Sequence, residues 1–250
     1  MLLLHGIGHS LRIWFRTMPA LTSAGFRAVA IDTPGFGYSQ APEAILGEAA
    51  TAAFLAEFLD TFYLERVHVV GHSLGGALAT VFALHRPERV DRLALVAPAV
   101  GPDVNPALRI LGLQVARPLL RPVALRQVFG LFATSWDDDL LESEVADAER
   151  WLADPVARRY FWNVLRTGLR LRGVRPEWLL LERLKELQMP VMFAWGRRDM
   201  ILPVSNLEKI RARLPRARCE VYPEAGHMLP YEAAEKFSAD LIDFLASEAA

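Results

Sequence analysis

Short apolar runs rich in β-forming residues alternate with helix-like segments along most of this chain. The predicted strands cover residues 2–4, 26–31, 67–70, 92–97, 191–195 and 219–222. The predicted helices cover residues 11–24, 47–62, 74–84, 205–214 and 231–246. This alternation is typical of a mostly parallel sheet flanked by helices, and near-continuous apolar strands indicate that both faces are covered. The chain is therefore predicted to be α/β, with ligands bound beyond the carboxyl ends of the strands.

The alternation stops between residues 101 and 186, where the chain reads as helical and has no convincing strand. Charge is segregated there, because residues 137–154 hold eight acidic residues and one arginine, whereas residues 155–176 hold six arginines and no acid. We interpret both stretches as solvated helix faces that pair with each other. The sequence thus predicts a core domain of residues 1–100 and 187–250, with residues 101–186 inserted between two strands of its sheet.

The composition of the 250 residues excludes several classes of protein. Apolar residues make up 52% of the chain and charged residues 23%, which allows a sizeable core and excludes disorder for the bulk of it. The net charge of −1 leaves no basic excess to bind a nucleic-acid backbone. Cys219 is the only cysteine, so we predict neither an internal disulfide nor a multi-thiolate zinc site, and no metal.

One stretch without acidic or basic residues, 67–85, has nearly the length of a membrane span. It holds three glycines and a serine in its middle, and a buried strand, a turn and a helix explain it better. The apolar start at residues 1–4 is too short for a secretory signal and has no basic residues before it. We therefore expect a soluble, cytoplasmic protein with no membrane span.

Gly71-His72-Ser73-Leu74-Gly75 lies where a predicted strand ends and a predicted helix begins. The reason for this G-x-S-x-G spacing is steric. The serine sits on a sharp, strained turn that exposes its Oγ, and the glycines let strand and helix pass closely. The helix N-terminus also directs N–H groups and its positive dipole end at this place. We therefore predict that Ser73 is a catalytic nucleophile.

A serine hydroxyl needs a general base, and the base needs a carboxylate to hold it. His227 begins the loop after the last predicted strand, so we expect it at the carboxyl edge of the sheet. Asp199 follows the preceding strand, and Asp103, after the strand at 92–97, is its competitor. We favour Asp199, which gives the chain order Ser73, Asp199, His227.

An oxyanion forms when a serine attacks a carbonyl group, and it needs two N–H donors. The candidates are the backbone N–H of Leu74, directly after the nucleophile, and that of Ile7, in the glycine-flanked loop after the first strand. The substrate pocket is expected between the sheet edge and the inserted segment. Its candidate lining residues are Met228, Met200, Trp136 and Trp162.

Five motifs make the sequence similar to the α/β-hydrolase superfamily over nearly its whole length. They are His5-Gly6-x-Gly8, Asp32-x-Pro34-Gly35-x-Gly37-x-Ser39, Gly71-His72-Ser73-Leu74-Gly75-Gly76, Trp195-Gly196-Arg197-x-Asp199, and Gly226-His227 followed by Pro230 and Glu232. The resemblance implies a Ser-His-Asp mechanism with an acyl-enzyme intermediate, a helical cap formed by the insertion, and no cofactor. It also implies a structural role for the loop at residues 32–39.

Members of this superfamily usually have a pair of strands before the His-Gly loop, and here that pair is expected to be missing. The strand at residues 26–31 is then predicted to be an edge of the sheet, with unpaired backbone groups. Such an edge allows a dimer through the exposed strand.

We expect a serine hydrolase that cleaves a carboxylic ester of a small or medium apolar substrate. A serine nucleophile argues against haloalkane dehalogenases and most epoxide hydrolases, which use a carboxylate. Residues 227–230 are more similar to the esterase ending than to the Trp-rich ending of carbon–carbon bond hydrolases. A carbon–carbon bond hydrolase, a lactonase or a thioesterase of the same fold remains an alternative. A non-catalytic ligand receptor of this fold is the alternative from another class.

Overall fold

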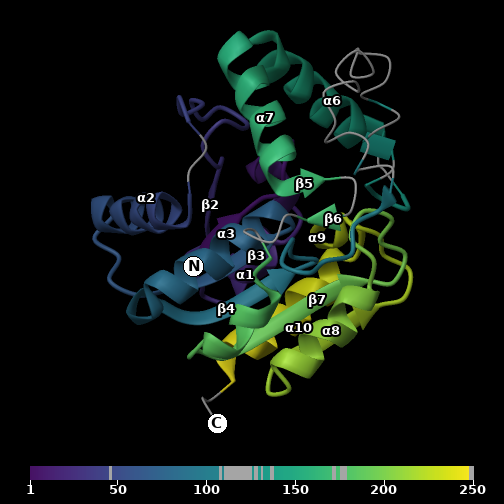
Figure 1. Ribbon diagram of the computed structural model, residues 1–250. Helices are drawn as coiled ribbons and strands as arrows, with labels where there is room; N and C mark the ends of the chain where they lie inside the picture. The colour runs from purple at the N-terminus through teal and green to yellow at the C-terminus, as the bar shows by residue number, and fades with distance from the viewer. Residues whose placement is uncertain are drawn as a thin grey trace.

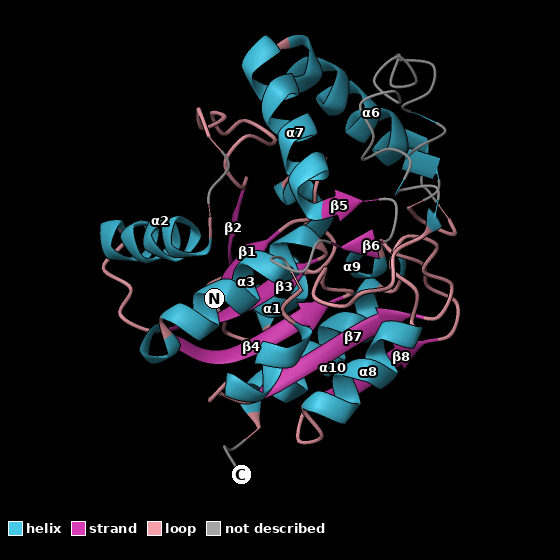
Figure 2. Ribbon diagram, viewed as in Figure 1, coloured by secondary structure: helices cyan, strands magenta, loops and turns pink. Residues whose placement is uncertain are grey.

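The computed structural model describes residues 1–44, 47–106, 109, 126, 129–130, 132–135, 138–170, 173–174 and 179–247. Its centre is a parallel sheet of six strands in the order β2-β1-β3-β4-β7-β8. Figures 1 and 2 show this sheet among the helices that surround it. The strands are β1 (Leu2–Leu4), β2 (Val29–Ile31), β3 (Val67–His72), β4 (Val90–Val96), β7 (Val191–Gly196) and β8 (Arg218–Tyr222). Every pairing in this sheet is parallel, which confirms the predicted α/β class.

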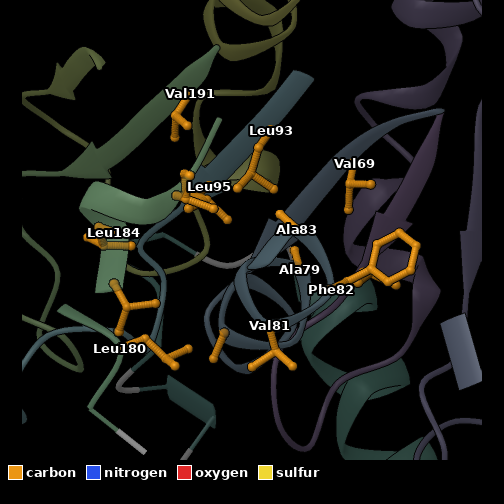
Figure 3. Close-up of a cluster of buried hydrophobic side chains, with 14 of the residues drawn as sticks. Val69, Ala79, Val81, Phe82, Ala83, Leu93, Leu95, Leu180, Leu184 and Val191 are labelled. Carbon is orange, nitrogen blue, oxygen red and sulfur yellow. The ribbon is translucent and has the colours of Figure 1, made fainter. Parts of the chain in front are cut away.

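The sheet buries both of its faces, because successive side chains of a strand point to opposite sides. Leu2 and Leu4 of β1 belong to one hydrophobic cluster, whereas Leu3 between them belongs to a second cluster on the other face. Figure 3 shows part of the first cluster, where Val69 of β3 lies beside Phe82. Burial on both sides explains why the strands read as continuous apolar runs.

Helical elements cover each face. The first cluster is covered by α2 (Glu48–Thr61), α3 (Leu74–His85), η5 (Leu181–Glu186) and α8 (Ser205–Arg213). The second is covered by η1 (Leu11–Trp14), α1 (Met18–Ser23), α9 (Leu229–Glu232) and α10 (Ala234–Ala246). A short helix, η2 (Pro87–Arg89), leads into β4. None of the described helices is long and apolar enough to cross a membrane.

Two helices that the sequence predicts as continuous are broken. Residues 11–24 form η1 and α1 with a turn between them, in which the N–H of Thr17 donates to the carbonyl oxygen of Trp14. Pro19 lies in the first turn of α1, where its missing N–H costs no helical hydrogen bond. The segment at residues 231–246 is shared between α9 and α10.

Strand β2 is shorter than predicted and lies at one edge of the sheet. Only Val29–Ile31 of the predicted strand at 26–31 pairs with β1. Within the described ranges, β2 has no strand on its other side, which agrees with the predicted edge. A dimer through this edge stays a prediction.

The segment between β4 and β7 contains α6 (Asp138–Ala153), α7 (Pro155–Gly168) and a short antiparallel pair, β5 (Leu169–Arg170) with β6 (Gly173–Val174). The prediction of no strand in this segment is therefore wrong. Strands of two residues leave no periodic pattern in the sequence by which they could be predicted. Figure 1 shows α6 and α7 packed together on one side of the molecule. η5 packs into the main core, and the division of the chain into a core domain and an insertion stays a prediction.

Candidate active site

Ser73 lies in the turn that joins β3 to α3, and its backbone is strained. Its φ of 54° and ψ of −116° fall in a region that residues with side chains rarely adopt. The N–H of Ser73 donates to the carbonyl oxygen of Val96 at 2.9 Å, and its own carbonyl oxygen accepts from the N–H of Ala99 at 2.9 Å. The neighbouring strand β4 therefore holds the turn in its strained form.

Gly71 and Gly75 are required by the close approach of β1, β3 and α3. A β-carbon on Gly71 would lie 2.4 Å from the carbonyl oxygen of Gly75. A β-carbon on Gly75 would lie 2.4 Å from the carbonyl oxygen of Leu4. These distances leave no room for any side chain, so the spacing of the motif follows directly from the packing of strand against helix.

His227 and Asp199 form a buried pair at the carboxyl edge of the sheet. The Nδ1 of His227 lies 2.7 Å from Oδ2 of Asp199, and neither side chain is exposed. The other carboxylate oxygen, Oδ1, accepts from the N–H groups of Ile201 and Leu202, each at 2.8 Å. Because a carboxylate oxygen accepts, Nδ1 carries the proton and Nε2 has the lone pair. The Nε2 is buried and has no hydrogen-bond partner among the described residues.

Glu232 in α9 organises the loop that carries His227, a role that sequence reasoning missed. One of its oxygens accepts from the N–H of Gly226 at 2.9 Å and from that of Thr134 at 2.9 Å. The other accepts from the N–H of Met228 at 3.0 Å. Glu232 was part of the family motif, but its contact with Thr134, 98 residues away, could not be predicted.

His72 connects the nucleophile turn to the His227 loop. Its Nε2 donates to the carbonyl oxygen of His227 at 2.9 Å, and the two rings have centroids 4.7 Å apart. Complete burial lowers the pKa of His72 well below its usual value, and the neighbouring His227 lowers it further. His72 is therefore neutral and acts as a fixed hydrogen-bond donor between the two segments.

His5 and Asp32 hold the loops after β1 and β2. The Nδ1 of His5 donates to the carbonyl oxygen of Gly6 at 2.7 Å, and its Nε2 accepts from the N–H of Thr33 at 2.9 Å. Asp32 accepts from the N–H of Leu11 at 2.7 Å. These contacts fit the structural role that the family resemblance implies for this part of the chain.

The two predicted oxyanion donors lie on either side of the nucleophile turn. Leu74 is the first residue of α3, and Ile7 lies in the turn after β1. In the described part of the chain, neither amide N–H has an acceptor. A β-carbon on Gly6 would lie 3.0 Å from the Cβ of Ser73, so the Ile7 loop lies directly against the nucleophile.

His9 and Glu144 form a second buried pair, which the sequence did not predict. The Nδ1 of His9, in the Ile7 loop, lies 2.9 Å from Oε2 of Glu144 in α6. Beside it, the Nε of Arg12 lies 3.3 Å from Oδ2 of Asp147. Glu144 is 2% exposed and Asp147 is 8% exposed, so the interpretation of the acidic stretch as a wholly solvated face is wrong. Glu144 and Asp147, one helical turn apart, instead contact His9 and Arg12 of the core.

The four predicted pocket residues differ in their exposure to solvent. Met228 is fully buried and packs in the second hydrophobic cluster. Met200 is 58% exposed, and its role as a pocket wall stays a prediction. Trp162 is a buried residue of α7. Trp136 lies outside the described residues.

Asp103, the competing carboxylate, lies in a different environment from Asp199. Its Oδ2 is 2.6 Å from the Nζ of Lys209 and accepts from the hydroxyl of Ser205 at 2.8 Å. The structure thus brings Asp199 to His227 and ties Asp103 to α8. Among the described residues, no group of three His, Cys, Asp or Glu side chains could hold a metal ion.

Comparison with protein families matches residues 1–234 to the family described as alpha/beta hydrolase fold. A 2-hydroxy-6-oxononadienedioate/2-hydroxy-6-oxononatrienedioate hydrolase of Paraburkholderia phymatum is 30% identical over 257 residues, which cover 98% of this chain and 86% of that protein.

Solved structures show the same architecture. The 2-hydroxy-6-oxo-6-phenylhexa-2,4-dienoate hydrolase of Rhodococcus sp. strain RHA1 matches with a TM-score of 0.80 and 25% identity, over 98% of this chain and 90% of that one. A carboxylesterase of Bacillus subtilis matches in fold with a TM-score of 0.75 and 23% identity, over 99% and 84% of the two chains. The chain therefore belongs to the alpha/beta hydrolase family.

Proposed function

We propose that this protein is a serine hydrolase that cleaves carboxylic esters of small or medium apolar substrates through an acyl-enzyme. The observation that carries the proposal is the buried His227–Asp199 pair, whose free Nε2 belongs to a loop hydrogen-bonded to His72, the residue before Ser73. A strained serine, a histidine with a free lone pair and a buried carboxylate are the parts that acyl transfer requires.

In the first half of the reaction, His227 Nε2 takes the proton of the Ser73 hydroxyl while the oxygen attacks the ester carbonyl carbon. The N–H groups of Leu74 and Ile7 stabilise the oxyanion, each contributing about 3 kcal/mol in the transition state. Collapse of the tetrahedral intermediate breaks the bond to the alcohol, which receives the proton from His227. The acyl group remains on Ser73 as an ester.

In the second half, His227 takes a proton from water, and the resulting hydroxide attacks the acyl carbon. The acid then leaves, and Ser73 recovers its proton from His227. Asp199 holds the imidazole in one tautomer and stabilises its cationic form in both halves. Residues of α6 and α7 serve in this proposal as a helical cap, since Glu144 of α6 contacts His9 in the loop beside the nucleophile and Asp147 contacts Arg12 of η1.

The test is hydrolysis of p-nitrophenyl esters from acetate to palmitate, with wild type beside Ser73→Ala. We expect turnover by wild type, loss in the variant, and a chain-length optimum that reflects the size of the pocket. Retained hydrolysis in folded Ser73→Ala would contradict the proposal. Absent turnover by folded wild type, combined with tight ligand binding, would favour the non-catalytic receptor instead.

A carbon–carbon bond hydrolase is the second candidate, favoured by the similarity over 98% of the chain to a hydrolase of a hydroxy-oxo-dienedioate. The same triad would attack a ketone, but the leaving group would be a carbon atom that must receive a proton. Turnover of 2-hydroxy-6-oxo-6-phenylhexa-2,4-dienoate, measured beside the p-nitrophenyl esters, distinguishes the two. A higher kcat/KM for the dienoate than for the p-nitrophenyl esters would favour carbon–carbon bond hydrolysis as the function.

A further inference from the structure

His9 and Glu144 form a second histidine–carboxylate pair with the same arrangement as His227 and Asp199. In both pairs the histidine Nδ1 contacts a carboxylate oxygen, at 2.9 Å and 2.7 Å. The side chains of His9 and Glu144 are 1% and 2% exposed. A histidine–carboxylate pair buried this completely needs further hydrogen bonds to its remaining polar atoms to offset its loss of hydration.

The pair has two polar atoms that nothing in the described part of the chain satisfies. They are Nε2 of His9 and Oε1 of Glu144, and both are buried. Buried polar atoms in native proteins nearly always have a partner, because removing them from water without one is costly. Two such atoms in one pair therefore point to a group that binds there.

The pair lies next to the nucleophile. The N–H of His9 donates to the carbonyl oxygen of Gly6 at 3.4 Å, and Gly6 packs against Ser73. The ring of Phe132 contacts both histidines, with its centroid 5.2 Å from that of His9 and 5.8 Å from that of His227. The ring centroid of His9 also lies 6.4 Å from that of His72, the residue before Ser73, so these contacts place the His9–Glu144 pair beside the nucleophile turn.

The chemistry of the two free atoms selects the group that fits. If His9 is neutral, its Nδ1 donates to Glu144 and its Nε2 has a lone pair that needs a donor. If His9 is cationic, Nε2 is a donor that needs an acceptor. A hydroxyl group satisfies Nε2 in either state. When His9 is cationic, the hydroxyl oxygen accepts from Nε2 and its proton is free to be donated to Oε1 of Glu144. A ketone or ester oxygen fits only the cationic state.

Charged groups fit less well. A carboxylate would lie beside the Glu144 carboxylate in a dry environment and would be repelled. An ammonium group can donate to both atoms when His9 is neutral, but its charge must be removed from water into a buried site, which costs more than burying a hydroxyl. A hydroxyl adds no charge, so it has the smallest desolvation cost of the three.

We propose that His9 and Glu144 form a hydroxyl-binding subsite, and that the substrates are esters with a free hydroxyl group near the scissile bond. This inference rests on the proposed ester hydrolysis and names its substrate class. In this arrangement the hydroxyl orients the ester over Ser73, and an alkyl group in its place leaves both polar atoms unpaired.

A purely structural role for the pair is the competing explanation, because it also joins α6 to the Ile7 loop. Arg12 of η1, three residues after His9, contacts Asp147 of α6 at 3.3 Å, and Arg12 is partly exposed. Asp147→Asn therefore weakens this junction without touching His9 or Glu144. It is the matched control for any effect that comes only from loosening the segment.

The experiment compares esters in which a hydroxyl replaces a methyl group of the same size. The acyl pair is ethyl 3-hydroxybutanoate and ethyl 3-methylbutanoate, and the alcohol pair is 2-hydroxyethyl butanoate and propyl butanoate. Ethyl 3-aminobutanoate tests the ammonium alternative. Acid release is followed at constant pH for wild type and variants, and kcat/KM is determined for each ester.

Wild type is expected to prefer the hydroxylated ester in at least one pair by about tenfold or more, as one well-placed hydrogen bond provides. Glu144→Gln keeps the shape of the side chain but removes its acceptor at Oε1, so the preference should fall severalfold. The double variant His9→Phe/Glu144→Met removes both polar groups without leaving a buried charge, and it should abolish the preference. Asp147→Asn should keep the wild-type preference.

Three results would overturn the inference alone while ester hydrolysis stands: equal rates within both pairs, an equal fall in preference in Asp147→Asn, or a preference for the amino ester. If the double variant does not fold, the preference of Glu144→Gln for the hydroxylated ester tests the inference, and an unchanged preference would overturn it. Absence of turnover for all five esters by folded wild type would overturn the proposed ester hydrolysis, and the subsite with it.

Discussion

The Nδ1 of His227 lies 2.7 Å from Oδ2 of Asp199, and both side chains are shielded from solvent. The second oxygen of Asp199 is occupied by the N–H groups of Ile201 and Leu202. Asp199 therefore has one orientation and one oxygen available for His227. A pair fixed in this way keeps the histidine Nε2 ready to act as a base.

Asp199→Asn is expected to lower kcat by about 10⁴-fold while the protein stays folded, because the amide no longer selects the right tautomer of His227. The measurement is kcat on the best p-nitrophenyl ester, with circular dichroism to verify folding. Asp103→Asn is the matched control and should retain wild-type kcat, since Asp103 contacts Lys209 instead. The opposite pattern would show that the wrong aspartate has been assigned.

Ser73→Gly is expected to be more stable than Ser73→Ala. Ser73 has a φ of 54°, which glycine adopts without strain and alanine does not. Strain of this kind costs about 1–3 kcal/mol, so the free energy of unfolding should differ by roughly that amount between the two inactive variants. Urea unfolding measures the difference. Equal stability would mean that the turn is not strained in solution.

Glu232→Gln is expected to reduce both stability and kcat. Glu232 accepts from the N–H groups of Gly226, Met228 and Thr134, and an amide offers only one oxygen for these donors. Hydrogen bonds to a charged group contribute about 1.5–3 kcal/mol each, so a loss of about 2 kcal/mol in the free energy of unfolding is expected. Urea unfolding and kcat are measured together.

Glu235→Gln, a neighbouring change in the first turn of α10, is the control for Glu232→Gln and should leave both quantities near wild type. If Glu232→Gln unfolds earlier but keeps its kcat, the loop that carries His227 is positioned without Glu232.

The protein is expected to lose stability as the pH falls below about 6.5. Burial lowers the pKa of His5 from 6.5 to about 4, and it lowers the pKa of His72 well below 6.5. At pH values between the lowered pKa of His5 and the ordinary 6.5, the unfolded chain binds protons that the folded protein does not. The free energy of unfolding therefore rises with pH over this range. The contribution of His5 is on the order of 3 kcal/mol across the full window.

Urea unfolding at a series of pH values from about 6.5 to about 5 tests this expectation. His5→Gln should flatten the dependence in part, since glutamine does not titrate and can still donate and accept. A free energy of unfolding that does not change over this range would show that folding does not lower the pKa of the two buried histidines.

The region around Ser73 was predictable from sequence because its constraints are local. A β-carbon on either glycine beside the serine would lie 2.4 Å from a backbone carbonyl oxygen, so no other residue fits. The positions of Asp199 and His227 followed from a second local rule, that loops after parallel strands gather at one edge of the sheet.

The pairing of His9 with Glu144 was not predictable, because it joins residues 135 positions apart. Glu144 lies in a strongly acidic stretch whose average character is that of a solvated helix, and only the packing of α6 shows that it is buried. The hairpin of β5 and β6 was missed for another reason, since strands of two residues have no periodicity to detect.

The most direct test of the account is the detection of the acyl-enzyme. Wild type is quenched with acid during turnover of a p-nitrophenyl ester, and peptide mass spectrometry locates the acyl group. We predict an acyl group on Ser73, absent when Ser73→Ala is treated in the same way. Turnover without an adduct on Ser73, or an acyl group on another residue that persists in Ser73→Ala, would contradict the account.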